Sequence, residues 1–267
     1  MEDIIMTQKR IWIILASLLL WGSVAEAAVV TRTIPYRQGG VDLQGFLAYD
    51  NALQGKRPGV LVVHEWWGLN DYARKRAEQL ASLGYVAFAL DMYGKGKVTD
   101  HPKQAQEFMT RVTENVESWR KRALAGLEIL KKQPNTDPRR IAAIGYCFGG
   151  STVQQLAYSG ADIKGIVSFH GSLVLPPASA ASQVKAKILI CHGAADPFTK
   201  PELLLKYIAA MNASQIDWQM VIFGHAKHSF TNPGADKYGM PQLGYNREAD
   251  LRSWRYMRQF FDEIFSE

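Results

Sequence analysis

The sequence predicts an α/β fold in which a doubly wound, mostly parallel β-sheet is flanked by helices. Apolar runs rich in β-branched residues alternate along the chain with amphipathic stretches of helical period. Several runs are unbroken, as is typical of strands covered on both faces. With 267 residues, 47% hydrophobic and 21% charged, the chain has the composition of a globular protein with a full core. We therefore expect a single domain over residues 28–267.

The first half of the chain predicts a hairpin followed by alternating strands and helices. Gly39 and Gly40 separate two alternating runs, which indicates a hairpin turn. Asn70 or Asp71 is expected to cap the first helix, and Gly84 to end it. The predicted strands are 29–36, 41–49, 59–63 and 85–90, and the predicted helices are 71–83 and 102–132, the latter in two pieces before a turn at 134–138.

The second half continues the alternation, with the right-handed crossovers that parallel strands require. A strand over 140–146 runs directly into a helix. The later elements are strands 163–169, 187–191 and 217–223, helices 201–211 and 248–265, and loops 172–182 and 231–245, of which the first suits the mouth of a pocket. In sheets of this kind, active residues gather at the carboxyl ends of the strands.

The N-terminus has the pattern of a secretory signal peptide. Lys9 and Arg10 precede an apolar run over 11–21, and a small-residue cleavage site ends at Ala27. We expect residues 1–27 to be removed and the mature protein to be exported, to the periplasm. The run is too short for a comfortable membrane span, so no stable insertion is expected once the leader is cut. An uncleaved anchor helix is the alternative.

Charge and cysteine content exclude several classes of protein. The formal net charge is +6, but the basic residues are scattered in twos and threes along predicted helices, so we expect no nucleic-acid partner. The chain has only two cysteines, so an exported protein of this size must depend on its core rather than on disulfides. Cys191 lies in the apolar run 187–191 and is expected to be a buried strand residue, unpaired with Cys147.

The motif Gly145-Tyr146-Cys147-Phe148-Gly149 stands where a buried strand turns into a helix. Glycines suit such a turn because the backbone is strained and helix and strand pack closely. The motif matches the nucleophile elbow of α/β-hydrolases with cysteine in place of serine, so Cys147 is the predicted nucleophile at the N-terminus of the helix. The alternative is a small buried cysteine in a glycine-rich turn.

Two further residues follow predicted strands and complete a catalytic triad. Asp196 and His228 come after Cys147 in the order nucleophile, acid, histidine that α/β-hydrolases use. His225 competes with His228 for the role of base, although Ser229-Phe230 favours His228. A metal pair of His225 and His228 lacks a third ligand, so we expect neither metal nor cofactor. Asp196 precedes a proline and has the alternative role of capping a turn.

Residues 64–68 and 91–95 supply the other predicted site residues. The backbone amides of Trp66 and Phe148 are the expected oxyanion donors. An apolar pocket is expected to be walled by four aromatic residues, Trp66, Trp67, Tyr93 and Phe148, although aromatic residues at strand ends are often plain core. Glu65 lies between strand and aromatics, where desolvation raises the proton affinity of a carboxylate; the alternative is a solvated loop glutamate.

These motifs together resemble the dienelactone hydrolase family, also called carboxymethylenebutenolidases. The resemblance rests on residues 64–71, 89–94, 145–150, 192–197 and 228–233 and extends from about Tyr36 to the C-terminus. It implies a single-domain α/β-hydrolase without a cofactor and with a Cys147–His228–Asp196 triad. It also implies that Glu65 contacts the thiol and accepts its proton when substrate binds.

Two positions depart from the family pattern. Where the family carries arginines that grip the substrate carboxylate, this chain has Lys95 and Asn232, which lack the planar bidentate guanidinium. The resemblance therefore implies hydrolysis of small-molecule carboxylic esters or lactones without fixing dienelactone as the substrate. The alternative hypotheses are a thioesterase or small peptidase on the same fold, or a non-catalytic protein that binds an apolar ligand.

Overall fold

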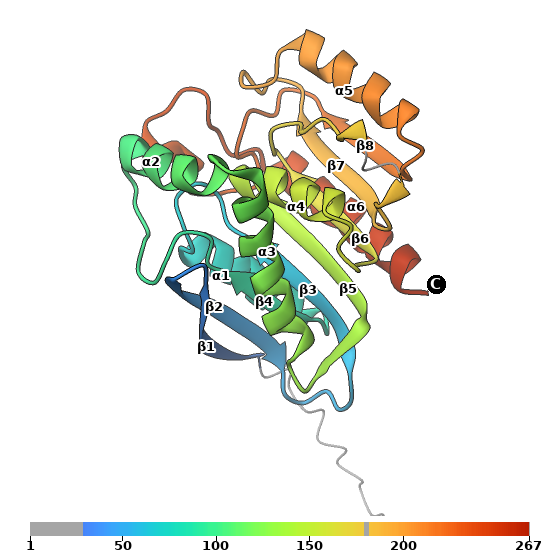
Figure 1. The fold of residues 1–267 in the computed structure, drawn as a ribbon. Helices are drawn as coiled ribbons and strands as arrows, with labels where there is room; N and C mark the ends of the chain where they lie inside the picture. The colour runs from blue at the N-terminus through green and yellow to red at the C-terminus, as the bar shows by residue number, and fades with distance from the viewer. Residues whose placement is uncertain (1–28, 179–181, 267) are drawn as a thin grey trace, which may run out of the picture.

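The computed structural model describes residues 29–178 and 182–266 (Figure 1). The predicted signal peptide lies outside the described residues. The strands are β1 (Val29–Gln38), β2 (Val41–Asp50), β3 (Arg57–Val63), β4 (Val86–Leu90), β5 (Thr136–Tyr146), β6 (Gly165–Phe169), β7 (Lys187–Gly193) and β8 (Trp218–Phe223). The helices are α1 (Asp71–Ser82), α2 (Pro102–Thr113), α3 (Val116–Lys131), α4 (Phe148–Tyr158), α5 (Pro201–Ala213), α6 (Arg247–Ser266) and the 3₁₀ helix η2 (Ala235–Tyr238).

The strands form one eight-stranded sheet in the order β1-β2-β4-β3-β5-β6-β7-β8. Strands β3 to β8 are parallel, and the β1–β2 hairpin joins antiparallel to β4. At the hairpin turn Gly39 and Gly40 have φ values of 56° and 78°, which explains the glycine pair. The predicted mostly parallel, doubly wound sheet is therefore confirmed.

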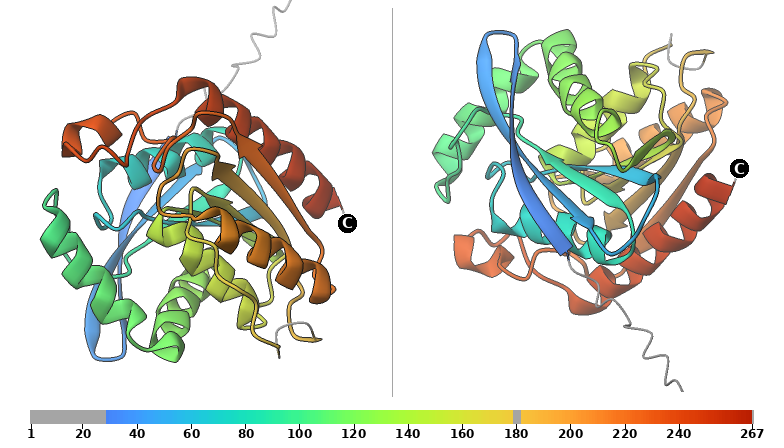
Figure 2. Two further views of the ribbon diagram at one scale, coloured as in Figure 1. Left: turned by 90° about the horizontal axis from the view of Figure 1, so that it is seen from above. Right: turned by 90° about the horizontal axis from the view of Figure 1, so that it is seen from below.

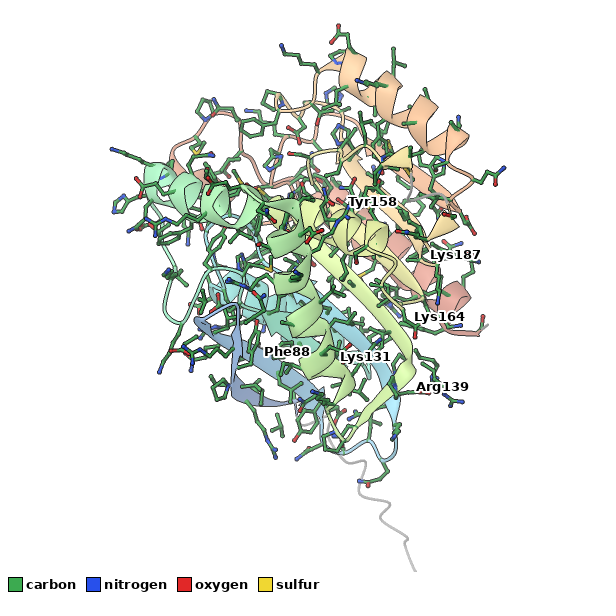
Figure 3. All side chains as sticks on the ribbon, in the orientation of Figure 1. Phe88, Lys131, Arg139, Tyr158, Lys164 and Lys187 are labelled. Atoms are coloured by element: carbon green, nitrogen blue, oxygen red, sulfur yellow. The ribbon has the colours of Figure 1, made fainter. Side chains whose placement is uncertain are left out.

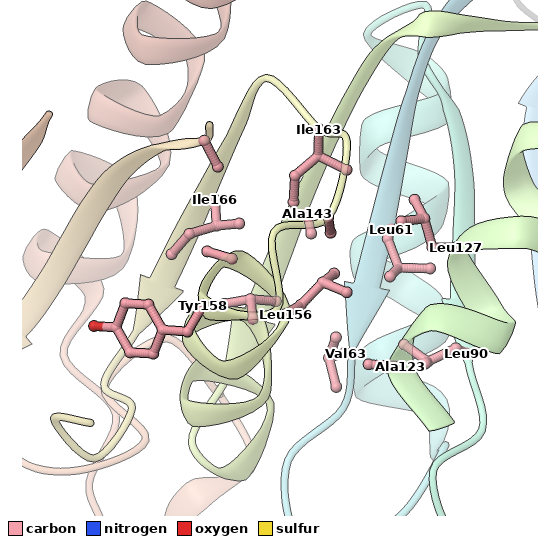
Figure 4. Close-up of a cluster of buried hydrophobic side chains, with 14 of the residues drawn as sticks. Leu61, Val63, Leu90, Ala123, Leu127, Ala143, Leu156, Tyr158, Ile163 and Ile166 are labelled. Carbon is pink, nitrogen blue, oxygen red and sulfur yellow. The ribbon is translucent and has the colours of Figure 1, made fainter. Parts of the chain in front are cut away.

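Helices cover both faces of the sheet and bury two separate apolar layers. Helices α1 and α6 pack on one face, and α3, α4 and α5 on the other (Figure 2). Figure 4 shows the second layer, where Leu127 of α3 and Leu156 of α4 meet Leu61 and Val63 of β3. These side chains are almost completely buried, and truncating one such leucine to alanine costs about 2–5 kcal/mol. The core holds the parallel strands in register and so fixes where their carboxyl ends meet.

Four basic residues lie at the other end of the sheet, where Arg139 pairs with Asp137 and Lys187 pairs with Asp217 and Glu263. Lys131, Arg139, Lys164 and Lys187 lie at or near the amino ends of β5, β6 and β7 (Figure 3). Phe88 of β4, also labelled there, fills the space over a glycine of β2. No helix within residues 29–178 and 182–266 is long and apolar enough to cross a membrane.

The structure differs from the predicted elements mainly before the elbow strand. The predicted turn at 134–138 is partly strand, because Thr136 and Asp137 pair with Arg57 and Pro58 before a shift in register. This added pairing extends β5 to 11 residues. The break in the predicted helix 102–132 is confirmed between α2 and α3, where the Asn115 side chain caps α3 by accepting from the amide of Ser118.

Candidate active site

Cys147 lies at a strained turn between β5 and α4. Its φ of 52° and ψ of −117° are unusual for a residue with a side chain, and such strain costs about 1–3 kcal/mol. Its amide donates to the Phe169 carbonyl at 3.0 Å and to Nδ1 of His170 at 3.1 Å. These bonds fix the turn from β6, so the sulfur is presented at the N-terminus of α4, where the helix dipole favours negative charge.

The glycines of the elbow motif are required by close backbone contacts. A Cβ on Gly145 would lie 2.0 Å from the carbonyl oxygen of Gly149, and one on Gly149 would lie 2.2 Å from that of Val63. A Cβ on Gly150 would meet the Ser168 hydroxyl at 2.6 Å. Side chains are excluded because helix α4 packs directly on the ends of β3, β5 and β6.

His228 and Asp196 meet beside Cys147. Nδ1 of His228 lies 2.7 Å from Oδ2 of Asp196, and the imidazole also hydrogen-bonds the Cys147 side chain. Burial alone would lower the pKa of His228, but the Cys147 sulfur and the Asp196 carboxylate raise it to about 10. Burial would likewise raise the pKa of Asp196, and the hydrogen bond and charge of His228 lower it instead. Hydrogen bonds therefore connect the Cys147 sulfur to the His228 imidazole and the imidazole to the Asp196 carboxylate.

The path of the loop after β8 determines which of the two candidate histidines faces the triad. His228 is buried and faces Asp196, whereas His225 is exposed at the edge of the sheet. Phe198 packs edge-on against the His228 ring at a centroid distance of 4.9 Å. A bridge from His228 to Leu243 ties the loop to the segment that follows η2. Both cysteines are free, and Cys191 is buried in β7 as expected.

Glu65 is buried, and each of its two carboxylate oxygens accepts a hydrogen bond. Ser229 Oγ donates to Oε1 and Asn232 Nδ2 donates to Oε2, each at 2.7 Å. Burial raises the pKa of Glu65 against the lowering effect of these two bonds. No contact with the thiol is found among the described residues, so the thiol-activating role of Glu65 stays a prediction. Asn232 holds this carboxylate and does not line the cavity described below.

The two predicted oxyanion donors both belong to residues that line the cavity at Cys147. The amides of Trp66, after β3, and of Phe148, at the start of α4, donate no hydrogen bond to another described residue. Trp66 and Phe148 both line the same cavity as Cys147. Two unused amides beside a nucleophile are the donor arrangement that stabilises a tetrahedral oxyanion.

Two buried histidines, which had no predicted role, hydrogen-bond to the backbone of the site: His64 to the loop after β3 and His170 to the turn at Cys147. Nδ1 of His64 lies 2.5 Å from the carbonyl oxygen of Glu65, and its Nε2 accepts from the amide of Met92 at 3.2 Å. His170 accepts the Cys147 amide at Nδ1, and its Nε2 lies 2.7 Å from Thr231 Oγ1. Burial lowers the pKa of both histidines, so both are neutral at pH 7. In the sequence, the signal for both was a position directly after a strand, and His64 also begins one of the segments that carry the family resemblance.

A cavity of about 490 Å³ opens onto Cys147 and His228. Its apolar lining comes from the β3 and elbow loops, from α2 and α3, and from the later loops: Trp66, Met109, Trp119, Phe148, Val174, Phe198, Met240 and Leu243. Its other polar lining residues are uncharged: Gln106, Thr113, Ser151 and Ser172. Most of these were missed by the sequence analysis, because helices and loops without a motif supply them.

Three other predicted pocket residues lie outside this lining. Trp67 is fully buried and stacks on Tyr238 with ring centroids 3.9 Å apart. Tyr93 is buried against the rings of His64 and Phe148, and Lys95 is exposed. Within residues 29–178 and 182–266, no group of three or more His, Cys, Asp or Glu side chains is placed to hold a metal.

Comparison with known proteins identifies the same family. A model of the dienelactone hydrolase family matches residues 43–265. The "Putative carboxymethylenebutenolidase" of Aquifex aeolicus is 25% identical over 235 residues, covering 86% of this chain and 97% of that protein.

Two solved structures are similar in fold. A dienelactone hydrolase-like promiscuous phosphotriesterase from metagenomic libraries is 39% identical, with a TM-score of 0.86 over 89% of this chain and 99% of that one. Dienelactone hydrolase from Anabaena variabilis, at 22% identity, has a TM-score of 0.58 over 86% of this chain and 98% of that one. The resemblance and the α/β-hydrolase fold predicted from the sequence motifs are confirmed.

Proposed function

Because this chain belongs to the dienelactone hydrolase family and is therefore a hydrolase, we propose that it cleaves carboxylic esters or lactones with Cys147 as the nucleophile. The observation that carries this proposal is the chain of contacts from Asp196 through His228 to Cys147 at the mouth of an apolar cavity. Each member follows the carboxyl end of a different parallel strand, where active residues of such sheets gather.

The proposed reaction has two halves. The Cys147 thiolate, whose proton has passed to Glu65, attacks the carbonyl carbon, and the displaced electron pair forms an oxyanion that accepts from the amides of Trp66 and Phe148. The carbon–oxygen bond to the leaving group breaks as His228 gives it a proton, which leaves a thioester on the enzyme. Water then gives a proton to His228 and its oxygen to the acyl carbon, and the sulfur leaves. Asp196 holds the imidazole in the required tautomer throughout.

Glu65 is proposed to accept the thiol proton when substrate enters. Burial raises its pKa, so the ionised carboxylate binds a proton more strongly than an ordinary glutamate does, and it returns that proton to the Cys147 thiolate after turnover. The carboxylate must first leave the Ser229 and Asn232 hydrogen bonds, so this step requires a movement of Glu65.

Substitution of the two cysteines tests the nucleophile. We expect Cys147→Ala to abolish ester hydrolysis and Cys191→Ala, a matched change at a buried cysteine, to retain it. Mass spectrometry after mixing with a slowly deacylated ester is expected to find the acyl group on Cys147. Full activity of Cys147→Ala would refute the assignment.

A second candidate activity is phosphotriester hydrolysis. It is favoured by the 39% identity to a promiscuous phosphotriesterase over nearly the whole of both chains. A panel of esters, lactones, thioesters, peptides and phosphotriesters ranks these classes by kcat/KM. A protein that only binds an apolar ligand would turn over none of them, and its Cys147 would not react selectively with iodoacetamide below about pH 8.5, the unperturbed value for cysteine.

We also propose that the protein is exported to the periplasm with residues 1–27 as its leader. The basic pair, the short apolar run and the Ala-x-Ala site support this. Cell fractionation and N-terminal sequencing of the mature protein check it, with Ala28 as the expected first residue.

A further inference from the structure

The cavity that opens onto Cys147 offers no partner for a charged substrate. Among its described lining residues there is no lysine, arginine, aspartate or glutamate, and His228 already faces Asp196. From this lining we propose that the substrate is an uncharged ester with an apolar acyl group. This inference rests on the proposed hydrolase function and narrows its substrate class.

The two residues that stand where the family carries carboxylate-binding arginines do not face the cavity. The Lys95 side chain is exposed and outside the cavity lining, and the Asn232 amide donates to Glu65. Glu65 itself is 1% exposed behind the triad and, when ionised, would repel a second carboxylate. An unpaired carboxylate taken from water into such a site meets a large desolvation cost.

An apolar acyl chain, in contrast, fits the lining. Trp66, Trp119, Phe148 and Phe198 contribute aromatic faces, and Met109 and Met240 add flexible apolar side chains. Burying one methylene contributes about 0.8 kcal/mol, which corresponds to about a fourfold gain in kcat/KM per added carbon until the cavity is filled.

A matched pair of esters tests the substrate class. We expect kcat/KM for 4-nitrophenyl hexanoate to exceed that for mono-4-nitrophenyl adipate, which has the same chain length and a terminal carboxylate, by at least about 100-fold. Equal rates, or a preference for adipate, would overturn the inference while leaving the hydrolase proposal standing. Hydrolysis of neither ester, nor of other esters or lactones, would overturn both.

Placing a cation in the cavity provides a gain-of-function test. Gln106 and Gln104 are both exposed residues of α2, but of the two only Gln106 lines the cavity. We expect Gln106→Arg to shift the hexanoate-to-adipate ratio at least about tenfold toward adipate, and Gln104→Arg to leave it unchanged. An unchanged ratio in Gln106→Arg, or an equal shift in both variants, would contradict the role assigned to the uncharged lining.

A separate observation concerns His64, which is fully buried and contacts the peptide unit that carries a proposed oxyanion donor. The Met92 amide donates to Nε2, so the neutral ring carries its proton on Nδ1 and donates it to the Glu65 carbonyl. No cis peptide bond occurs in the described residues, so the Trp66 N–H points away from that carbonyl. We infer that His64 is a positioning residue that aims the Trp66 amide at the oxyanion.

Comparison of ester hydrolysis with thiol alkylation distinguishes this role from a general structural one. Alkylation by iodoacetamide needs the triad but forms no oxyanion. We expect His64→Leu to lower kcat by at least about tenfold, and by no more than the 10²–10³-fold loss that is typical when an oxyanion donor is removed. The rate of Cys147 alkylation should stay unchanged. His64→Asn, whose side-chain amide can replace the Nδ1 donor, should recover part of kcat. A parallel fall in alkylation, or a retained kcat in His64→Leu, would overturn the inference.

Discussion

Replacing Asp196 by asparagine is expected to trap His228 in the wrong tautomer. Oδ1 of Asp196 accepts the Phe198 amide at 2.9 Å, and Oδ2 accepts His228 Nδ1 at 2.7 Å. Because the Phe198 N–H can only donate, the asparagine oxygen must stay at the Oδ1 position, which turns the NH₂ group toward Nδ1. Nδ1 then accepts, the ring proton moves to Nε2, and Nε2 of His228 cannot take the proton of the attacking water.

The size of the effect follows from the role of the tautomer. In hydrolytic triads this substitution leaves the geometry intact and lowers kcat by about 10⁴. We therefore expect Asp196→Asn to lose about 10³–10⁴-fold in kcat/KM, or about 4–5.5 kcal/mol of transition-state stabilisation at 1.36 kcal/mol per decade. Both hydrogen bonds survive with reversed polarity at His228, so the variant should fold.

Steady-state hydrolysis of an uncharged ester, with circular dichroism to verify folding, checks this expectation. Asp217→Asn is the matched control, because the Asp217 side chain is 68% exposed and is not part of the triad. A loss of less than tenfold in Asp196→Asn would refute the argument from the tautomer. So would an equal loss in the control.

Three further predictions concern stability. Burial raises the pKa of Glu65, so the folded state binds this proton more tightly than the unfolded state does. The free energy of unfolding should therefore fall as the pH rises above about 4.5, by at most about 1.4 kcal/mol per pH unit. Glu65→Gln should remove this dependence in urea titrations at pH 5–8. Arg76→Met removes the ion-pair partner of the buried Asp250 carboxylate, which among the described residues keeps only the Tyr245 hydroxyl, and should cost about 3–5 kcal/mol, most of it recovered by adding Asp250→Leu. Gly149→Ala, whose Cβ would strike a β3 carbonyl at 2.2 Å, should lower the melting temperature strongly, whereas Gly224→Ala, with open space, should not.

The sequence predicted the parts of the site that depend on local chemistry. Strand-to-helix turns need glycine, and a triad needs three residue types after three strands, so Cys147, Asp196 and His228 could be found without coordinates. Ser229-Phe230 favoured His228 over His225 in the sequence, but spacing alone could not decide, because both residues follow β8 and the path of the loop sets which ring turns inward. Likewise, only sheet register shows that Thr136 continues β5.

The cavity and the supporting histidines could not be predicted, because they depend on packing between distant segments. Met109 and Trp119 reach the cavity from helices whose sequences read as ordinary amphipathic elements. The family resemblance placed Asn232 at the substrate, in the position of a family arginine, but its amide donates to Glu65 instead. The resemblance therefore gave the residue without the direction of its side chain.

Backbone strain in this protein is concentrated where the chemistry is proposed. Cys147, His170 and Ser229 have φ values of 52°, 41° and 57°, and they are three of the five non-glycine residues with positive φ in the described chain. Each is held by a hydrogen bond between elements: the Cys147 amide to His170, His170 to Thr231, and Ser229 to Glu65. Because such conformations persist only when their surroundings over-determine them, the sheet and its buried polar contacts must hold the sulfur and the imidazole in place before any substrate arrives. A preorganised site of this kind accelerates a reaction without reorganising during it, and this is why loss of a remote contact such as that of His64 is expected to lower kcat.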